Sequence, residues 1–134
     1  MNKLILVPKT MEAIKAVESK EICERAKAGG CTKNTRLYLA MQGTQEVGFL
    51  SLDLHPKDFF VYEIFVPKKY RRRQVGSYLL EQAERIASAS DYSVVLLKPY
   101  PLDSDLRLSD LVSWYERRGY VTVNSELMLK RLSI

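Results

Sequence analysis

The segment from Phe59 to Ser90 constrains the fold of this chain more than any other part of the sequence. Seven residues with strand character, FFVYEIF, lead into a short basic turn, and apolar residues at helical spacing follow from Gln74. The start of a helix presents unpaired N–H groups and the positive end of the helix dipole, which together favour bound phosphate. The turn adds the cations Lys68, Lys69, Arg71, Arg72 and Arg73. This combination predicts a site for a phosphorylated ligand.

The basic turn also accounts for most of the formal net charge of +5. A basic face spread over the surface would indicate nucleic acid, whereas a cluster confined to one turn favours a polyphosphate ligand. Nucleic acid is therefore the less favoured partner. That alternative stays open because Tyr70 lies within the cluster, and it predicts binding that weakens steeply with added salt.

The length and composition predict one domain spanning residues 1–134. No apolar run reaches the ~18 residues of a membrane span, so we expect no membrane association. The N-terminal sequence lacks the apolar region and cleavage site of a secretory signal, and we therefore expect a cytoplasmic protein. Cys23, Cys31 and the single histidine, His55, do not match the ligand spacing of a zinc site, so we expect no metal.

The hydrophobic pattern predicts an α+β fold with a mixed central sheet and helices on both faces. Three alternating segments indicate an antiparallel meander, and a continuously apolar segment indicates a strand buried on both faces. Thr10 and Ser109 are the expected N-caps of the first and last helices. The expected strands are 4–7, 35–42, 46–55, 59–66, 92–98, 121–123 and 126–132, and the expected helices are 11–28, 74–90 and 108–118. The predicted order is β-α-β-β-β-α-β-α-β-β.

Three stretches, in this order, resemble the GNAT superfamily of acyl-CoA-dependent N-acyltransferases. EIFVP at 63–67 is similar to the exit of the family's central strand, and RRRQVG at 71–76 resembles its pyrophosphate loop, Q/R-x-x-G-x-G/A. WYERRGY at 114–120 resembles its late aromatic-Tyr-x-x-x-Gly-aromatic motif. The resemblance covers residues 59–120, while the first 58 residues match only in the order of their elements. It implies a GNAT-like sheet and an acetyl-CoA-dependent N-acetyltransferase.

Two positions depart from the family pattern. Gln74 stands where the loop has its first glycine, which lets a backbone amide face the pyrophosphate. Because the first turn of a helix does not require positive φ, we expect Gln74 to offer its N–H all the same. Leu108 stands where many members carry an Asn that contacts the pantetheine arm. Both departures support an alternative, a degenerate module that binds acyl-CoA or a protein without turnover.

The resemblance implies direct attack of an amine on the thioester of acetyl-CoA, which needs a base, an oxyanion donor and an acid. The family counterpart of Tyr115 lies close to the CoA sulfur, so Tyr115 is the candidate acid, because a phenol of pKa ~10 can protonate a thiolate. Glu63 is the candidate base, His55 is a rival base, and the Val66 N–H is the implied oxyanion donor. Alternatively, Tyr115 only packs in the core, and Glu63 faces outward or pairs with a loop arginine.

The same resemblance implies a set of residues that bind acetyl-CoA: Phe65, Val66, Arg71, Arg72, Arg73, Gln74, Val75, Gly76, Ser77 and Tyr115. Lys68 and Lys69 are expected to face the 3′-phosphate or solvent. Asp103 and Asp105 either attract a cationic amine or belong to a polar surface loop. The expected acceptor is an amine of a protein, at a lysine or N-terminus, or of a small molecule, and the protein is a monomer or a homodimer.

Overall fold

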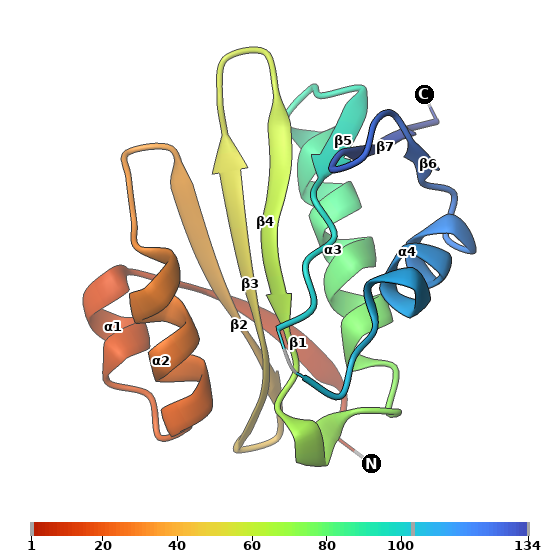
Figure 1. Ribbon diagram of the computed structural model, residues 1–134. Helices are drawn as coiled ribbons and strands as arrows, with labels where there is room; N and C mark the ends of the chain where they lie inside the picture. The colour runs from red at the N-terminus through yellow and green to blue at the C-terminus, as the bar shows by residue number, and fades with distance from the viewer. Residues whose placement is uncertain (1, 103, 134) are drawn as a thin grey trace.

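The structure is a computed structural model that describes residues 2–102 and 104–133. Among these residues the strands form one seven-stranded sheet in the order β1-β2-β3-β4-β5-β7-β6 (Figure 1). All neighbouring strands are antiparallel except β4 and β5, which are parallel. The strands are β1 (Leu4–Lys9), β2 (Thr35–Gln42), β3 (Gln45–Leu54), β4 (Phe59–Phe65), β5 (Val94–Leu97), β6 (Val121–Thr122) and β7 (Met128–Arg131). The predicted mixed sheet and its antiparallel meander are confirmed, and so is the order of elements along the chain apart from the first helix.

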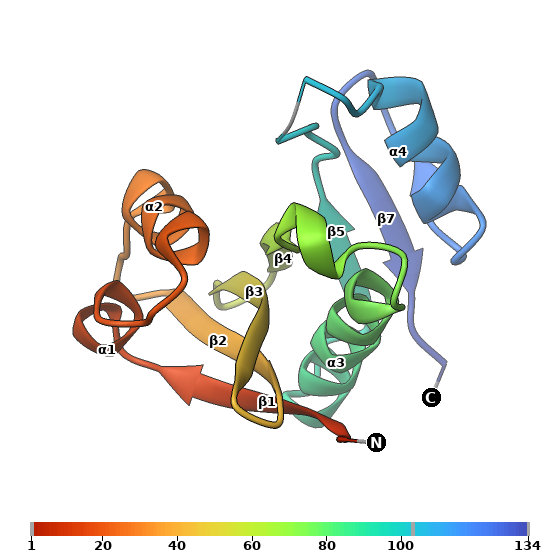
Figure 2. The ribbon, with the colours of Figure 1, turned by 90° about the horizontal axis from the view of Figure 1, so that it is seen from below.

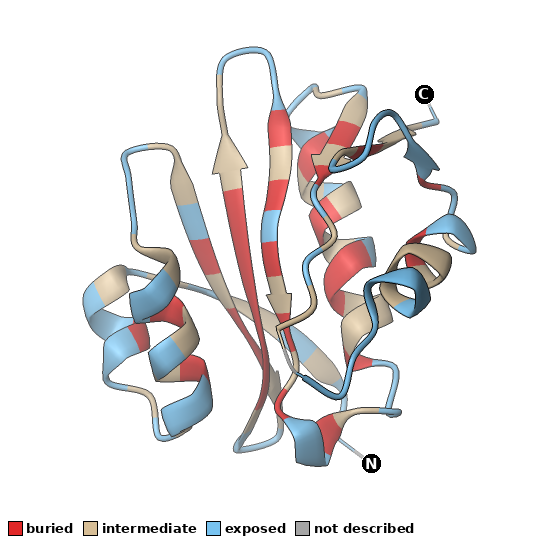
Figure 3. Cartoon of the chain, viewed as in Figure 1, coloured by how far each residue is buried: buried red, intermediate tan, exposed pale blue. Residues whose placement is uncertain are grey.

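Helices cover both faces of the sheet, as the sequence predicts. Figure 2 shows α1 (Met11–Lys15) and α2 (Lys20–Gly29) on one side and α3 (Val75–Ala89) on the other. Ile14 and Ile22 pack with Phe49 on the first side, while Leu79 packs with Leu50 in a separate cluster. Buried residues accordingly run along the central strands and the inner side of α3 (Figure 3). The helix α4 (Leu108–Glu116) lies beside the β5 and β7 end of the sheet (Figure 1). No helix of the described residues has the length and apolar character needed to span a membrane.

The first helix differs from its prediction. Thr10 is the N-cap, as expected, and its hydroxyl accepts a hydrogen bond from the Ala13 N–H at 3.1 Å. A single helix over 11–28 is wrong, however, because α1 ends at Lys15 and α2 begins at Lys20. The carboxylate of Glu46 accepts hydrogen bonds from the backbone N–H groups of Glu18 and Ser19, at 3.2 and 2.6 Å. A tertiary contact therefore holds the chain in a break that local periodicity does not reveal.

The start of the last helix also differs. Arg107 occupies the N-cap position of α4 without a side-chain hydrogen bond, and Ser109 lies inside the first turn. The prediction of Ser109 as N-cap is wrong because the helix begins at Leu108, one residue earlier. The other helix and strand boundaries agree with the predicted ones to within about two residues, the uncertainty normal at element ends.

The central strand parts from its parallel neighbour halfway along its length. β5 pairs with β4 only from Phe59 to Val61. On its other edge, β4 has a β-bulge, because Val61 pairs with Leu52 while Glu63 pairs with Ser51, leaving Tyr62 between them. Among the described residues, the second half of β4 therefore has one edge without a strand partner, and this edge opens the sheet next to the beginning of α3.

Candidate active site

A cavity of about 1340 Å³ lies where β4 and β5 separate. β4 and Arg25 of α2 form one wall, and α4 with the loop that precedes it forms another. The short 3-10 helix η1 (Lys68–Tyr70) and the first turn of α3 close one end. Sites for one small ligand usually occupy ~300–1,000 Å³, so this cavity has room for two reactants.

The phosphate loop, defined as residues 71–77, has an unusual backbone. Arg72 and Gln74 both adopt left-handed conformations, with φ of 65° and 67°. The expectation that position 74 needs no positive φ is therefore wrong. Gln74 is the N-cap of α3, and no side chain of the described residues makes a capping hydrogen bond there. The first-turn N–H groups thus remain available to a ligand, while Gln74 adopts a conformation that glycine reaches with less strain.

The five cations of the basic turn do not point the same way. Arg71 and Arg72 line the cavity, and Arg71 Nε donates to the Val66 carbonyl at 2.9 Å. Lys68 forms an ion pair with Asp105. Lys69 and Arg73 lie over the ring of Tyr70, 5.1 and 5.6 Å from its centroid. Of the predicted cofactor-binding set, only Arg73 does not line the cavity.

Tyr115 lies at the cavity wall on α4. Only 8% of the residue is exposed, and its ring packs edge-on against Trp114 and Tyr120, with centroids 5.0 and 5.7 Å away. No described residue forms a hydrogen bond with its hydroxyl. Burial raises the pKa of Tyr115 to about 12, so the phenol is protonated at neutral pH. Tyr115 is thus a core residue that also lines the cavity.

Glu63 lines the cavity from β4 and is only 7% exposed. Its two carboxylate oxygens accept hydrogen bonds from Arg25 Nε and Nη2, at 2.8 and 3.1 Å. The bond with Glu63 raises the pKa of Arg25 against the opposing effect of burial. Glu63 is therefore buried rather than outward-facing, and its partner is an arginine of α2 instead of the loop arginine that the sequence left open. Arg25 itself was not predicted, since no local pattern connects positions that lie 38 residues apart.

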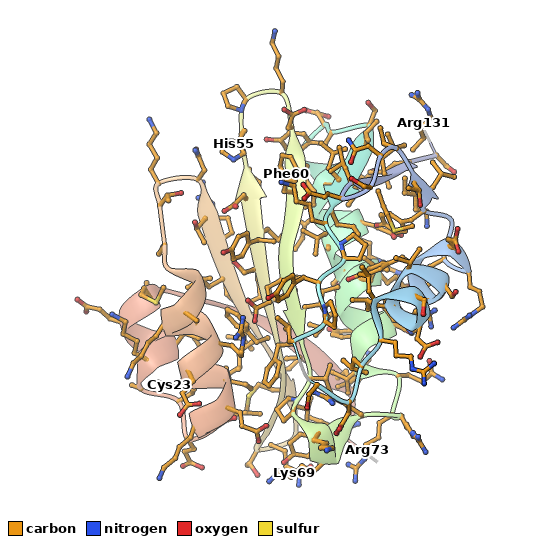
Figure 4. All side chains as sticks on the ribbon, in the orientation of Figure 1. Cys23, His55, Phe60, Lys69, Arg73 and Arg131 are labelled. Carbon is orange, nitrogen blue, oxygen red and sulfur yellow. The ribbon has the colours of Figure 1, made fainter. Side chains whose placement is uncertain are left out.

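The other predicted acceptor-side residues are scattered. His55 lines the cavity, but Figure 4 shows it with Phe60 at the opposite end of the sheet from Lys69 and Arg73. Its Nδ1 lies 3.3 Å from Asn34 Nδ2. Asp105 is held by Lys68, and this hydrogen bond lowers the pKa of the Asp105 carboxyl. Asp103 lies outside the described residues.

Arg118 is a further cavity residue that sequence reasoning missed. Its guanidinium lies 3.8 Å from the centroid of the Trp114 ring and donates to Ser77 Oγ at 2.8 Å. The only signal in the sequence is the second arginine of ERRG in the late motif. No group of three or more His, Cys, Asp or Glu side chains suited to a metal ion occurs in the described part of the chain.

Comparison with known proteins identifies the family to which this chain belongs. A family model described as an acetyltransferase (GNAT) domain matches residues 33–122, which is more than half of the chain. The chain belongs to the GNAT acetyltransferase family. The resemblance seen in the sequence is thereby confirmed, and the match begins 26 residues upstream of Phe59. Comparison of this GNAT domain with curated proteins gives no match.

Solved structures share the fold of this GNAT domain at low sequence identity. The ribosomal-protein-S18-alanine N-acetyltransferase from Escherichia coli aligns with a TM-score of 0.73 and 12% identity, covering 98% of this chain and 96% of that one. PaiA N-acetyltransferase from Thermoplasma acidophilum, in complex with coenzyme A, gives 0.68 and 15%, covering 97% and 99%. A GNAT acetyltransferase from Elizabethkingia anophelis with acetyl-CoA bound gives 0.66 and 16%, covering 96% and 98%. At these identities the likeness establishes the fold alone.

Proposed function

We propose that this protein transfers an acetyl group from acetyl-CoA to an amine that attacks the thioester directly. One observation carries the proposal: a single cavity joins an uncapped helix N-terminus, flanked by arginines, to a buried and protonated Tyr115. Membership of the GNAT family supports acyl transfer. The bound coenzyme A and acetyl-CoA of two solved structures with the same fold support acetyl-CoA as the donor.

The donor binds along the phosphate loop and the open edge of β4. The N–H groups of Val75, Gly76 and Ser77 bind the pyrophosphate, and Arg71 and Arg72 supply positive charge. Beyond Val61 the edge of β4 that faces β5 has no strand partner, so its backbone groups bind the pantetheine arm. The thioester then lies inside the cavity that Val66 and Tyr115 line.

Three groups then serve the transfer. As the amine nitrogen bonds to the carbonyl carbon, the Val66 N–H stabilises the negative charge on the carbonyl oxygen. The carbon–sulfur bond breaks, and Tyr115 gives its proton to the departing thiolate. Glu63, held by Arg25, orients the amine and takes its excess proton through a water molecule, because each carboxylate oxygen retains a second acceptor position.

The acceptor enters at the mouth of the cavity opposite the phosphate loop. Among the residues that line the cavity, Tyr62 and Tyr100 are exposed, by 52% and 74%. We propose a protein amine or a small amine as the acceptor, since these exposed tyrosines leave room for either and the charged pair of Arg25 and Glu63 is already matched.

A second function, acyl-CoA binding without turnover, is favoured by the strained Gln74 and by the apolar Leu108 at the start of α4. Calorimetry with acetyl-CoA and release of free CoA thiol in the presence of amines separate the two. The catalytic proposal requires both binding and amine-dependent release of thiol. Binding without release for peptide lysines, peptide N-termini, polyamines and amino acids would establish the binding module instead.

The donor site is tested by comparing a double variant inside the cavity with a control variant outside it. Arg71→Ala/Arg72→Ala removes two cavity cations, and we expect about a hundredfold weaker binding of acetyl-CoA. Arg85→Ala is the control, because Arg85 is exposed on α3 and pairs with Glu81 outside the cavity. Equal affinity for both variants, each shown to be folded by circular dichroism, would contradict the proposed donor site.

A further inference from the structure

Arg118 is held in place by three contacts next to the phosphate loop. Its Nη1 donates to the Trp114 carbonyl at 2.9 Å, and its Nη2 donates to Ser77 Oγ at 2.8 Å. The guanidinium stacks on the indole ring of Trp114 at 3.8 Å. These contacts fix the direction of the guanidinium before any ligand arrives, which lowers the entropic cost of binding.

Trp114 connects this arginine to the start of α3. A Cβ atom at Gly76 would lie 3.6 Å from Cζ2 of Trp114, so the indole packs directly on the first turn of the helix. The ring therefore lies between the helix N-terminus and the rest of α4. The cavity wall beside the phosphate loop is therefore formed by three residues in contact, Ser77, Trp114 and Arg118.

The charge on Arg118 is not balanced within the described residues. No described carboxylate lies within ion-pair distance of it, and Arg117 adds a second positive charge beside it. Burial and Arg117 lower the pKa of Arg118, although an arginine stays protonated at neutral pH. Holding a partly buried cation next to another cation costs free energy, which a bound anion offsets.

Lys68 and Lys69, expected from the sequence to face the 3′-phosphate or solvent, make contacts within the protein. Lys68 pairs with Asp105, and Lys69 lies over Tyr70. Coenzyme A carries a ribose phosphate in addition to its pyrophosphate, and the ribose directly follows the pyrophosphate in the molecule. A pyrophosphate on the first turn of α3 therefore puts the ribose phosphate within reach of a residue hydrogen-bonded to Ser77.

We propose that Arg118 binds the 3′-phosphate of coenzyme A and makes this enzyme discriminate CoA from 3′-dephospho-CoA. This inference rests on the proposed function. Trp114 and Ser77 position the guanidinium, and the N–H groups of Arg118 that make no hydrogen bond to described residues form charge-assisted hydrogen bonds with the phosphate.

The test is calorimetric titration of the full chain with CoA and with 3′-dephospho-CoA. We expect the wild type to bind CoA about tenfold or more tightly than 3′-dephospho-CoA. In Arg118→Ala, we expect the ratio of the two dissociation constants, 3′-dephospho-CoA to CoA, to fall to about one. The affinity for 3′-dephospho-CoA stays within about twofold of wild type. Arg117→Ala is the matched control, because Arg117 is the adjacent cation and also lines the cavity but is exposed, and we expect this variant to keep the preference.

Three results would overturn the inference. A wild type without preference, an Arg118→Ala variant that weakens both ligands equally, or a loss of preference in Arg117→Ala would each contradict it. Ser77→Ala provides a second variant if Arg118→Ala does not fold, since it frees the guanidinium without removing the charge and lowers the preference partially. Wild type that binds neither ligand contradicts the proposed function itself, whereas binding without preference contradicts only the role of Arg118.

Discussion

The two ends of the cavity satisfy their polar groups in opposite ways. At the phosphate loop, no side chain of the described residues caps the first turn of α3, and Arg71 and Arg72 line the cavity. At the other end, the Glu63 carboxylate is matched by Arg25 through two hydrogen bonds. The donor end is thus completed by its ligand, whereas the acceptor end is completed by the protein. We expect changes at the donor end to alter binding, and changes at the acceptor end to alter stability first.

The largest expected effect concerns Tyr115, which lies between the two ends. Tyr115→Phe removes the proton offered to the departing thiolate but preserves the ring packing. General acid catalysis contributes ~10²–10⁴-fold, so we expect kcat to fall by about a hundredfold or more while acetyl-CoA affinity stays unchanged. Thiol release and calorimetry measure the two quantities.

Tyr120→Phe is the control for Tyr115→Phe. Tyr120 is also buried, but its hydroxyl donates to Glu84 at 2.9 Å, and Tyr120 does not line the cavity. We expect Tyr120→Phe to lower stability and leave kcat nearly unchanged. A Tyr115→Phe variant with wild-type kcat would show that Tyr115 is only a packing residue.

The second effect concerns the acceptor end. Arg25→Met leaves the buried Glu63 carboxylate without its partner, and such losses cost ~3–5 kcal/mol when both charges are deeply buried. Because the Arg25 side chain is 32% exposed, we expect a smaller loss of unfolding free energy, about 2–3 kcal/mol, in urea titrations.

The double variant Arg25→Met/Glu63→Gln isolates the cost of the unpaired charge. Removing that charge restores most of the lost stability, and the double-mutant cycle then gives a large coupling energy. Additive losses in the two single variants would show that the pair contributes little. Donor affinity is unchanged in all three variants if the two ends of the cavity are independent.

The contrast between the two ends also explains what could be predicted from the sequence. The phosphate loop is contiguous, because a strand exit, a basic turn and a helix start follow each other from Val66 to Ser77. Glu63 lies just before this stretch in the sequence, but its partner, Arg25, comes from α2. The β-bulge at Tyr62, next to Glu63, has no recognisable sequence pattern. Arg118 was missed for the same reason, since its contact with Ser77 spans 41 positions.

The backbone conformation of the phosphate loop also could not be predicted from the sequence. The fold class, the order of strands and the helix α3 follow from periodicity and turn residues. The positive φ of Gln74 does not, because glutamine disfavours it and only the surrounding turn imposes it. The break between α1 and α2 likewise depends on Glu46, a residue of β3.

The third effect is a pH dependence specific to Tyr115. Its pKa is about 12 in the folded protein, against a reference of ~10 in the unfolded chain. Between these values the unfolded chain has lost the proton that the folded protein still holds. Stability therefore falls as pH rises through this range, by about 2–3 kcal/mol at most, and is fully present below pH ~10.

The measurement is urea unfolding of wild type and Tyr115→Phe at neutral pH, at about pH 10 and at about pH 11.5. We expect the wild type to lose more stability than the variant over the upper interval, since the variant lacks the phenol. Parallel losses in the two proteins would mean that Tyr115 ionises as readily in the folded protein as in the unfolded chain.

The smallest expected effect concerns Gln74, where one substitution tests whether the backbone strain also affects ligand binding. Gln74→Gly removes the steric cost of a side chain at φ of 67° but adds conformational freedom to the unfolded chain. We expect a net gain in unfolding free energy of roughly 1 kcal/mol. Asp91 is a matched position, because it has the same φ of 67° but lies beyond the end of α3, outside the cavity. We expect Gln74→Gly to raise the melting temperature, and Asp91→Gly to raise it less, because aspartate adopts the left-handed region more readily than glutamine.

We expect only Gln74→Gly to tighten acetyl-CoA binding. This substitution removes a side chain next to the first-turn N–H groups of α3, whereas Asp91→Gly does not. A severalfold gain in affinity at position 74, with none at position 91, would mean that glutamine limits the donor site. Equal affinities in all three proteins would mean that the left-handed backbone, and not the residue that adopts it, determines how the loop receives phosphate. In that case the strain at Gln74 concerns stability alone, and the donor end tolerates the departure from glycine because its ligands are backbone groups.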